Sequence, residues 1–259
     1  MLFDIKYNMK NFKEKYRTII SFACSFLLSC GLCFVFAFSS SETINEITPI
    51  SSHEFSLYCI SVAKSQLESE AKTLAEDSVK TNSGGYVWKK GNYFHVIASA
   101  YKNKNDAVLV STALSNNKIQ NEIIEFKYNE LRITTSNLSN EQSLFFNKAI
   151  KFFTNCYQEL FDVSVCIDTQ LYDDKKALLE INATITKAKE INDSYLLVPD
   201  DGKNLFINQL ELALKQTYQT LENLSQNKKI YEKQTFLSLV RFSYIKTCAI
   251  FYDFLNSVN

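Results

Sequence analysis

The sequence predicts an α+β protein, with a split β-α-β-β-α-β sheet domain on an N-terminal transmembrane helix, followed by an all-α helical bundle region. Three observations support this fold class. Residues 18–38 carry no charge, residues 55–135 alternate between strand and helix patterns, and residues 139–259 place apolar side chains at helical spacing. Only five Gly and two Pro occur in 259 residues, which disfavours a turn-rich all-β fold and favours long helices.

The charge balance and the sequence motifs exclude several functional classes. The 28 basic side chains balance 28 acidic ones, so the chain lacks the positive field that nucleic-acid binding needs. Its two His residues belong to no cluster of metal ligands. The sequence contains no phosphate loop, dinucleotide fingerprint, G-x-S-x-G or H-E-x-x-H motif. We therefore expect a protein that is not an enzyme and needs no cofactor.

Residues 18–38 predict the transmembrane helix. Their 21 uncharged residues are enough to cross a hydrocarbon core of about 30 Å at about 1.5 Å per residue. The preceding tail, residues 1–17, holds five basic and two acidic side chains. This bias keeps the N-terminus in the cytoplasm and sends the C-terminal domains outside. We expect a single-pass protein of the cell membrane.

Two other interpretations of this segment stay open. A signal peptide would be cleaved near Ala37-Phe38-Ser39, although the apolar run is longer than such a peptide needs. A lipoprotein would be modified at Cys30, although the apolar run continues past that residue. Small residues also recur every four positions and would let a second copy of the helix approach closely, so self-association is a further hypothesis; they are Ser21, Ser25, Ser29 and Cys33.

Residues 39–54 are polar and aperiodic, which predicts a linker between membrane and domain.

Beyond the membrane segment lie four cysteines in apolar surroundings, where a free thiol behaves as a small hydrophobe. They are Cys59, Cys156, Cys166 and Cys248. A disulfide is permitted outside the membrane, but the sequence does not assign one.

Residues 55–135 contain the predicted sheet domain. The expected elements are a strand over 55–62, a helix over 64–80, two strands over 86–89 and 92–101, a helix over about 105–116, and a strand or hairpin over 119–133. This order places two helices on one face of a four-stranded sheet and leaves the other face open.

Strand alternation predicts which side chains point to that open face. In residues 92–101, Phe94 and Val96 share one parity and would pack under the helices. Tyr86, Trp88, Tyr93 and His95 then lie on the open face. The alternative is that Tyr86 and Trp88 only cover the sheet or pack against the C-terminal helices, and that His95 is structural.

Two stretches carry a family resemblance, LYCISVAKSQLESEAKTLA and GGYVWKKGNYFHVIASAYKNKNDAVLVSTAL. Together they resemble a SPOR (sporulation-related repeat) domain over about residues 55–133. The matching positions are Tyr58, Ile60, Val62, Ala71, Gly85, Tyr86, Tyr93, Val96, Tyr101 and Ala107. The chain departs from the pattern where Ser61 replaces the usual Gln, Ala63 the usual Gly, and Ala98 or Ser99 the next Gly.

The resemblance implies a ribonucleoprotein-like fold and binding of peptidoglycan glycan strands stripped of their peptides, in sporulation or cell division. Family binding residues would fall on Ser61, Lys64, Tyr93 and His95. Tyr86 and Trp88 share the face by parity. Such a site suits sugars, because their CH faces pack on aromatic rings while their polar groups need a few oriented partners.

Two alternatives to glycan binding stay open. The replaced family residues at Ser61 and Ala63 favour a degenerate scaffold, whose helical region and anchor bind other membrane proteins. The ribonucleoprotein-like topology with an aromatic face also permits RNA binding. Residues 39–259 are expected on the outer side of the membrane and are mildly acidic, and both properties disfavour RNA binding. We therefore expect no nucleic-acid partner.

Residues 139–259 predict a helical domain. Ser139 and Gln142 have the spacing of a capping box. Further helices are expected over about 175–191, after the turn at 199–202, and over 234–255. The last of these is rich in aromatic residues, and its charged side chains argue against a second membrane span. We expect the buried central helix of an antiparallel bundle, or else a helix that binds a partner or a membrane surface.

Overall fold

The computed structural model describes residues 50–52, 55–128, 130–133, 138–196, 198, 205–226 and 236–258. The predicted tail, the predicted transmembrane helix over 18–38 and most of the predicted linker lie outside these ranges. Within them, no helix combines the length and the apolar character that a membrane crossing requires. Residues 48–259 form one compact unit.

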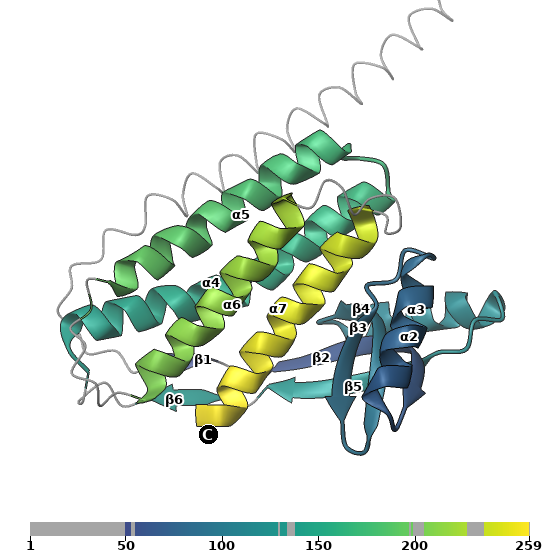
Figure 1. Ribbon diagram of the computed structural model, residues 1–259, viewed down its shortest axis with the longest axis horizontal. Coiled ribbons are helices and arrows are strands. Elements are labelled where there is room, and N and C mark those ends of the chain that lie inside the picture. Colours follow the sequence, from purple (N-terminus) through teal and green to yellow (C-terminus); the bar gives the residue numbers. More distant parts are fainter. Residues whose placement is uncertain are drawn as a thin grey trace, which may run out of the picture. The chain divides into compact units, whose positions relative to one another are not determined.

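The described chain has the predicted α+β architecture (Figure 1). Its main sheet is antiparallel, in the order β3-β4-β2-β5. These strands are β2 (Phe55–Ser65), β3 (Tyr86–Lys90), β4 (Tyr93–Tyr101) and β5 (Glu122–Tyr128). The helices between them are α2 (Glu68–Val79) and α3 (Lys104–Asn116), which confirms the predicted β-α-β-β-α-β order.

A second, two-stranded sheet was not predicted. It pairs β1 (Ile50–Ser52) with β6 (Leu131–Ile133) in antiparallel register. Because β1 falls inside the predicted linker, at least the end of that linker is part of the folded unit. Among the described residues β5 pairs with β2 and β6 pairs with β1. Residues 119–133 therefore hold two strands that do not pair with each other, and the hairpin that the sequence left as an alternative is not formed.

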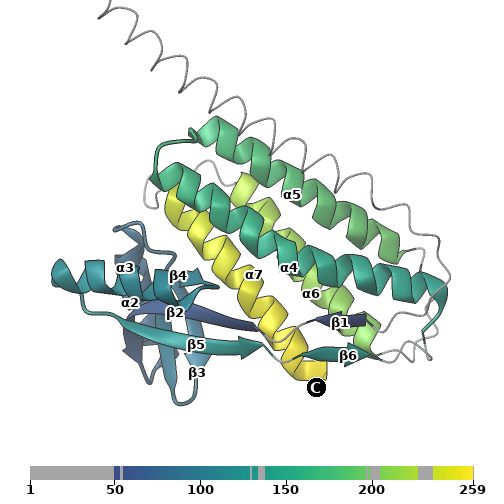
Figure 2. The same ribbon diagram turned by 180° about the vertical axis from the view of Figure 1, so that it is seen from behind.

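The helices α2 and α3 lie on one face of the main sheet (Figures 1 and 2). Ala71 and Ala75 of α2 bury against Val96 of β4, with Phe94 partly buried beside them. Strand parity therefore predicted this inner face correctly. The α3 helix begins at Asn103, whose side chain accepts a hydrogen bond from the Asn105 N–H.

The C-terminal half is an up-and-down bundle of four helices, as predicted. They are α4 (Asn140–Asp168), α5 (Asp174–Tyr195), α6 (Leu205–Gln226) and α7 (Phe236–Val258). The capping box is formed, because Ser139 Oγ accepts from the Gln142 N–H at 3.2 Å and Gln142 Oε1 accepts from the Ser139 N–H at 2.9 Å. Asp173 caps α5 with a single hydrogen bond, which its side chain accepts from the Lys176 N–H at 2.8 Å.

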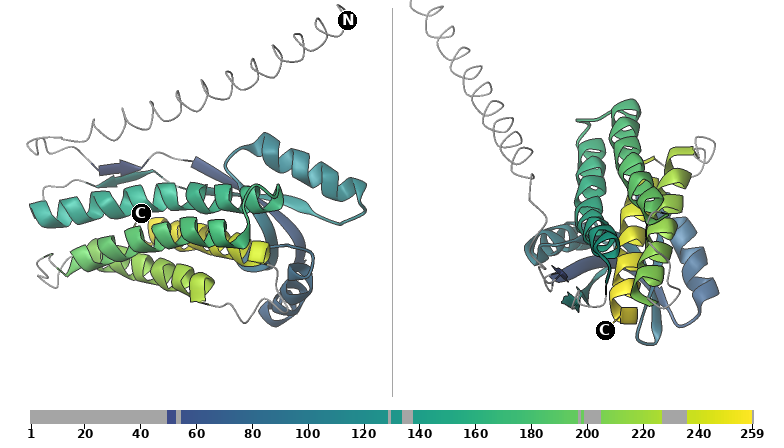
Figure 3. Two further views of the ribbon diagram at one scale, coloured as in Figure 1. Left: turned by 90° about the horizontal axis from the view of Figure 1, so that it is seen from above. Right: turned by 90° about the vertical axis from the view of Figure 1, so that its left-hand side faces the viewer.

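The second face of the sheet is not open, which corrects the sequence-based expectation. Helix α7 packs on β3 and β4 (Figures 2 and 3). Its buried side chains belong to the same hydrophobic core as those of the sheet. The sheet curls strongly enough that Trp88 on the edge strand β3 stacks on Phe126 of the opposite edge strand β5. Tyr252 of α7 then closes over both rings.

Two tyrosines attach the bundle to the end of β4 that extends past β3. The Ala100 N–H donates to the Tyr244 hydroxyl of α7 at 3.2 Å, and the Tyr157 hydroxyl of α4 donates to the Ala100 carbonyl at 3.0 Å. Both backbone groups are buried and lack a strand partner there, so the side chains satisfy them instead.

Candidate functional site

The six residues predicted for the site separate into two groups. Tyr86 and Trp88 lie under α7. Four others gather at the end of the sheet that carries the β3–β4 turn: Ser61, Lys64, Tyr93 and His95. A fifth residue joins them there, Glu122 of β5, which the sequence did not indicate. We call these five residues the sheet-end cluster.

Trp88 is part of the core, and the partly buried Tyr86 packs against that core. The Trp88 side chain is 5% exposed and stacks on Phe126 with ring centroids 3.8 Å apart. The Tyr86 ring meets the edge of Phe242 of α7 at 5.6 Å, and burial raises its pKa to about 12. The alternative considered for these two residues, packing against the C-terminal helices, is the one that the structure shows. The Trp88 ring presents no free face to a sugar while α7 is in place, and the Tyr86 ring is partly buried.

A bulge in β2 brings Ser61 and Lys64 to the same face. Their numbers differ by three, so simple alternation would put them on opposite faces of the sheet. The register shifts on both sides of Ser61, so that Ser61 lies opposite Ile97 and Lys64 lies opposite His95. Both side chains therefore lie on the same face as the His95 ring.

Charges and hydrogen bonds connect the sheet-end cluster. Lys64 Nζ lies 3.1 Å from Glu122 Oε2 and 5.5 Å from the centre of the Tyr93 ring. Glu122 Oε1 lies 3.4 Å from His95 Nδ1, and Ser61 Oγ lies 3.5 Å from the same nitrogen. Glu122 was missed because only the pairing of β2 with β5 places it opposite Ser61.

The cluster has a buried floor and an exposed rim. Ser61 and His95 are 1% and 7% exposed, whereas Tyr93 is 39% exposed and the side chains of Lys64 and Glu122 are exposed as well. Burial lowers the pKa of His95; the nearby Glu122 carboxylate opposes this shift, and the ammonium groups of Lys64 and Lys90 add to it. The floor thus holds a neutral imidazole at neutral pH.

The Ser61, His95 and Glu122 side chains do not have the geometry of a catalytic triad. In a triad the serine contacts one ring nitrogen and the acid contacts the other. Here both contact Nδ1, and the Ser61 hydroxyl donates to the Ala63 carbonyl at 2.9 Å. The arrangement offers polar groups and a ring surface, which suits binding.

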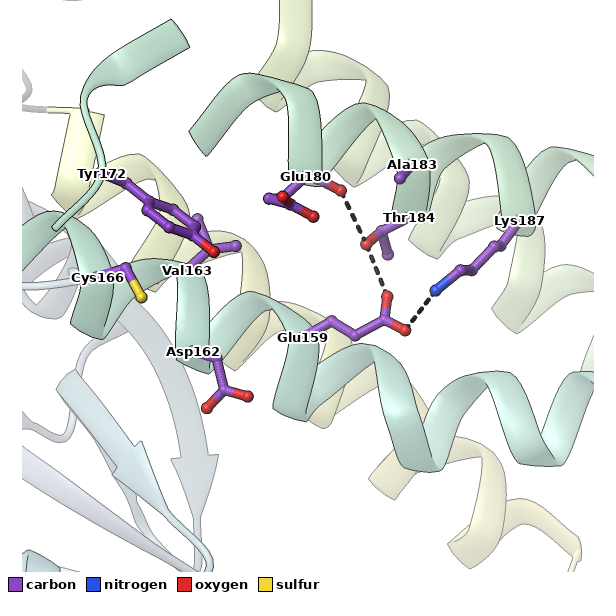
Figure 4. A pocket seen from close by; sticks show the side chains of 9 residues that line it. All are labelled: Glu159, Asp162, Val163, Cys166, Tyr172, Glu180, Ala183, Thr184 and Lys187. Atoms are coloured by element: carbon purple, nitrogen blue, oxygen red, sulfur yellow. Dashed lines mark hydrogen bonds and ion pairs between the residues drawn. The ribbon is translucent and has the colours of Figure 1, made fainter. Parts of the chain in front are cut away.

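A separate groove of about 270 Å³ lies between α4 and α5 (Figure 4). Its wall holds an ion pair between Lys187 and Glu159 at 2.6 Å, and Thr184 donates to the same carboxylate at 2.8 Å. The sequence indicated none of the residues that line this groove as a site residue. Among the described residues, no three His, Cys, Asp or Glu side chains are grouped to hold a metal ion.

The four cysteines beyond the predicted membrane segment are unpaired. Cys59, Cys156 and Cys248 are buried in the shared core, as expected of small apolar side chains, and burial raises the pKa of each thiol.

None of the protein-family models, curated proteins or solved structures with which the chain was compared matches it.

Proposed function

We propose that this is a non-catalytic, membrane-anchored protein of the bacterial cell envelope that binds peptidoglycan glycan strands, in sporulation or cell division. Its N-terminus would lie in the cytoplasm and its C-terminal part outside, as the sequence predicts. The observation that carries the proposal is the gathering of Ser61, Lys64, Tyr93 and His95 at one accessible end of the sheet. These are the positions to which the SPOR resemblance assigns glycan binding.

The sheet-end cluster has the groups that a sugar needs. The exposed Tyr93 ring offers a surface for the CH face of a pyranose. Lys64 supplies N–H donors and Glu122 supplies acceptor oxygens at the rim. Because α7 covers the rest of the face, a glycan strand would contact only this end of the sheet. The binding site would therefore be shorter than one that runs across the whole sheet.

The test is co-sedimentation of the full-length chain, in detergent, with intact and with peptide-stripped peptidoglycan sacculi. The double variant Lys64→Ala, Tyr93→Ala removes two of the three rim side chains and leaves Glu122. We expect it to bind stripped sacculi roughly tenfold more weakly, because losing a ring contact and a charge-assisted hydrogen bond costs about 1.5 kcal/mol together.

The chain contains a matched control on its helical half. Lys176 sits over the Tyr172 ring with Nζ 5.5 Å from its centre and pairs with Glu180, as Lys64 does with Tyr93 and Glu122. The double variant Lys176→Ala, Tyr172→Ala should bind like the wild type. Failure of the wild type to sediment with either form of sacculus would contradict glycan binding.

A second candidate function is a scaffold that binds other membrane proteins without binding glycan. The observation that favours it is the filling of the sheet face by the protein's own helix α7. Membrane-protein partners would then bind the helical region or the anchor, and the small-residue stripe within residues 18–38 would support self-association. Crosslinking to such a partner in cells, together with no binding to sacculi, would support this function over the first.

A further inference from the structure

The hydrogen-bond partners of His95 determine which ring nitrogen carries the proton. Two groups lie near Nδ1: Glu122 Oε1 at 3.4 Å and Ser61 Oγ at 3.5 Å. A carboxylate can only accept. The Ser61 hydroxyl has already given its hydrogen to the Ala63 carbonyl, so its oxygen also acts as an acceptor toward the ring. Because both acceptors lie next to Nδ1, the neutral imidazole carries its proton on that nitrogen.

The other ring nitrogen, Nε2, is consequently a bare acceptor. It makes no hydrogen bond with any residue that the structure describes. Among the described residues, three side-chain N or O atoms are fully buried and have no hydrogen-bond partner: Asn192 Oδ1, Thr217 Oγ1 and Thr247 Oγ1. His95 Nε2 is not one of them, although it too has no partner in the part of the chain that the structure describes. His95 Nε2 therefore reaches the surface. The centre of the Tyr93 ring lies 6.3 Å from that of the imidazole.

We infer that His95 Nε2 accepts a hydrogen bond from an amide N–H of the ligand, the group carried by each N-acetylated sugar of a glycan strand, and that binding requires the neutral ring. This inference rests on the proposed function and adds to it a specificity-determining atom. An amide N–H can only donate, so it cannot pair with a protonated imidazole, which also only donates.

The charges around His95 set the pH at which this acceptor is lost. The charged groups that act on the ring are Glu122 of β5, Lys64 of β2 and Lys90 of β3. Burial and the two ammonium groups lower the pKa of His95 below its ordinary value of about 6.5, and Glu122 opposes them. Binding should accordingly be full above about pH 6.5 and fall as the pH drops through the lowered pKa.

The experiment measures co-sedimentation of the full-length chain with peptide-stripped sacculi from about pH 8 to about pH 5. Two near-isosteric variants separate the ring nitrogens. His95→Asn keeps an amide near the place of Nδ1 and loses the acceptor at Nε2, so it should bind about 3- to 10-fold more weakly at neutral pH. His95→Gln carries an amide oxygen to the place of Nε2, so it should bind better than His95→Asn and show no loss with acid.

Two further variants move the titration while leaving His95 in place. Glu122→Gln removes the charge that favours the protonated ring, so the midpoint of binding should shift to lower pH. Lys90→Met removes a positive charge, so the midpoint should shift to higher pH. Lys90 contacts the Glu125 carbonyl and the Phe126 ring outside the sheet-end cluster.

The outcomes are distinguishable. Shifts in these directions, with a flat profile for His95→Gln, support the inference. Wild type and His95→Gln with the same acid-dependent profile overturn it and leave glycan binding standing. If the wild type binds stripped sacculi at no pH, the proposed function fails and the role of His95 fails with it.

Discussion

Trp88 illustrates what a single residue does and does not reveal. Strand alternation placed its side chain on the correct face of the sheet, together with Tyr86. An exposed aromatic platform and a buried core ring have the same local pattern, however. Only the packing of α7 over Trp88 decides that this ring belongs to the core.

Trp88→Ala should therefore act on stability. Emptying the space that a buried Trp fills costs about 3–5 kcal/mol of unfolding free energy. Chemical denaturation followed by far-UV circular dichroism would measure this loss. Tyr93→Ala is the control from the same sheet face; at 39% exposure it should cost less than about 1 kcal/mol. Equal, small effects for both variants would mean that Trp88 is not buried as described.

At the scale of elements, α7 connects the two halves of the chain. The sequence predicted a buried helix in a bundle, and 14 of its 23 residues are buried. Its aromatic side chains contact those of the sheet and of α4, and the helix also packs against α6. Arg241, one of the charges that argued against a membrane span, donates to the Asn82 carbonyl and pairs with Asp168.

Tyr244→Phe tests how α7 is attached to the sheet. The change leaves the buried Ala100 N–H without its acceptor, which should lower the unfolding free energy by about 1–3 kcal/mol. Urea denaturation measures the difference. Tyr252→Phe provides a matched control on the same helix: its ring packs on Trp88, but its hydroxyl makes no hydrogen bond with a described residue, so the change should cost under about 0.5 kcal/mol. A Tyr244→Phe variant as stable as Tyr252→Phe would exclude this attachment.

At the scale of the whole molecule, the sheet and the bundle share one hydrophobic core. Leu57, Cys59 and Phe126 of the sheet belong to the same cluster of buried side chains as Phe153 of α4 and Phe251 of α7. Residues 48–259 also form a single compact unit. The boundary predicted between residues 135 and 139 separates two types of secondary structure that pack together.

Residues 48–137 expressed alone should consequently fail to fold cooperatively. Without the bundle, Trp88, Phe126 and Tyr128 would face water, and the apolar area lost is too large for the remaining small core to replace. Thermal melting by circular dichroism, with dye binding to exposed apolar surface, would detect this. A sharp melting transition for the fragment, without dye binding, would instead identify two independent domains.

The sequence by itself determined the type and order of the main-sheet strands and of the helices α2 to α7, the capping box at Ser139, and the face on which each β3 and β4 side chain lies. These depend on local periodicity and on hydrogen bonds between near neighbours, which a linear pattern records. The tertiary structure alone decided that α7 fills the second sheet face, that the bulge in β2 aligns Lys64 with His95, and that Glu122 joins them. Those outcomes follow from contacts between residues far apart in the chain, and no local pattern contains them.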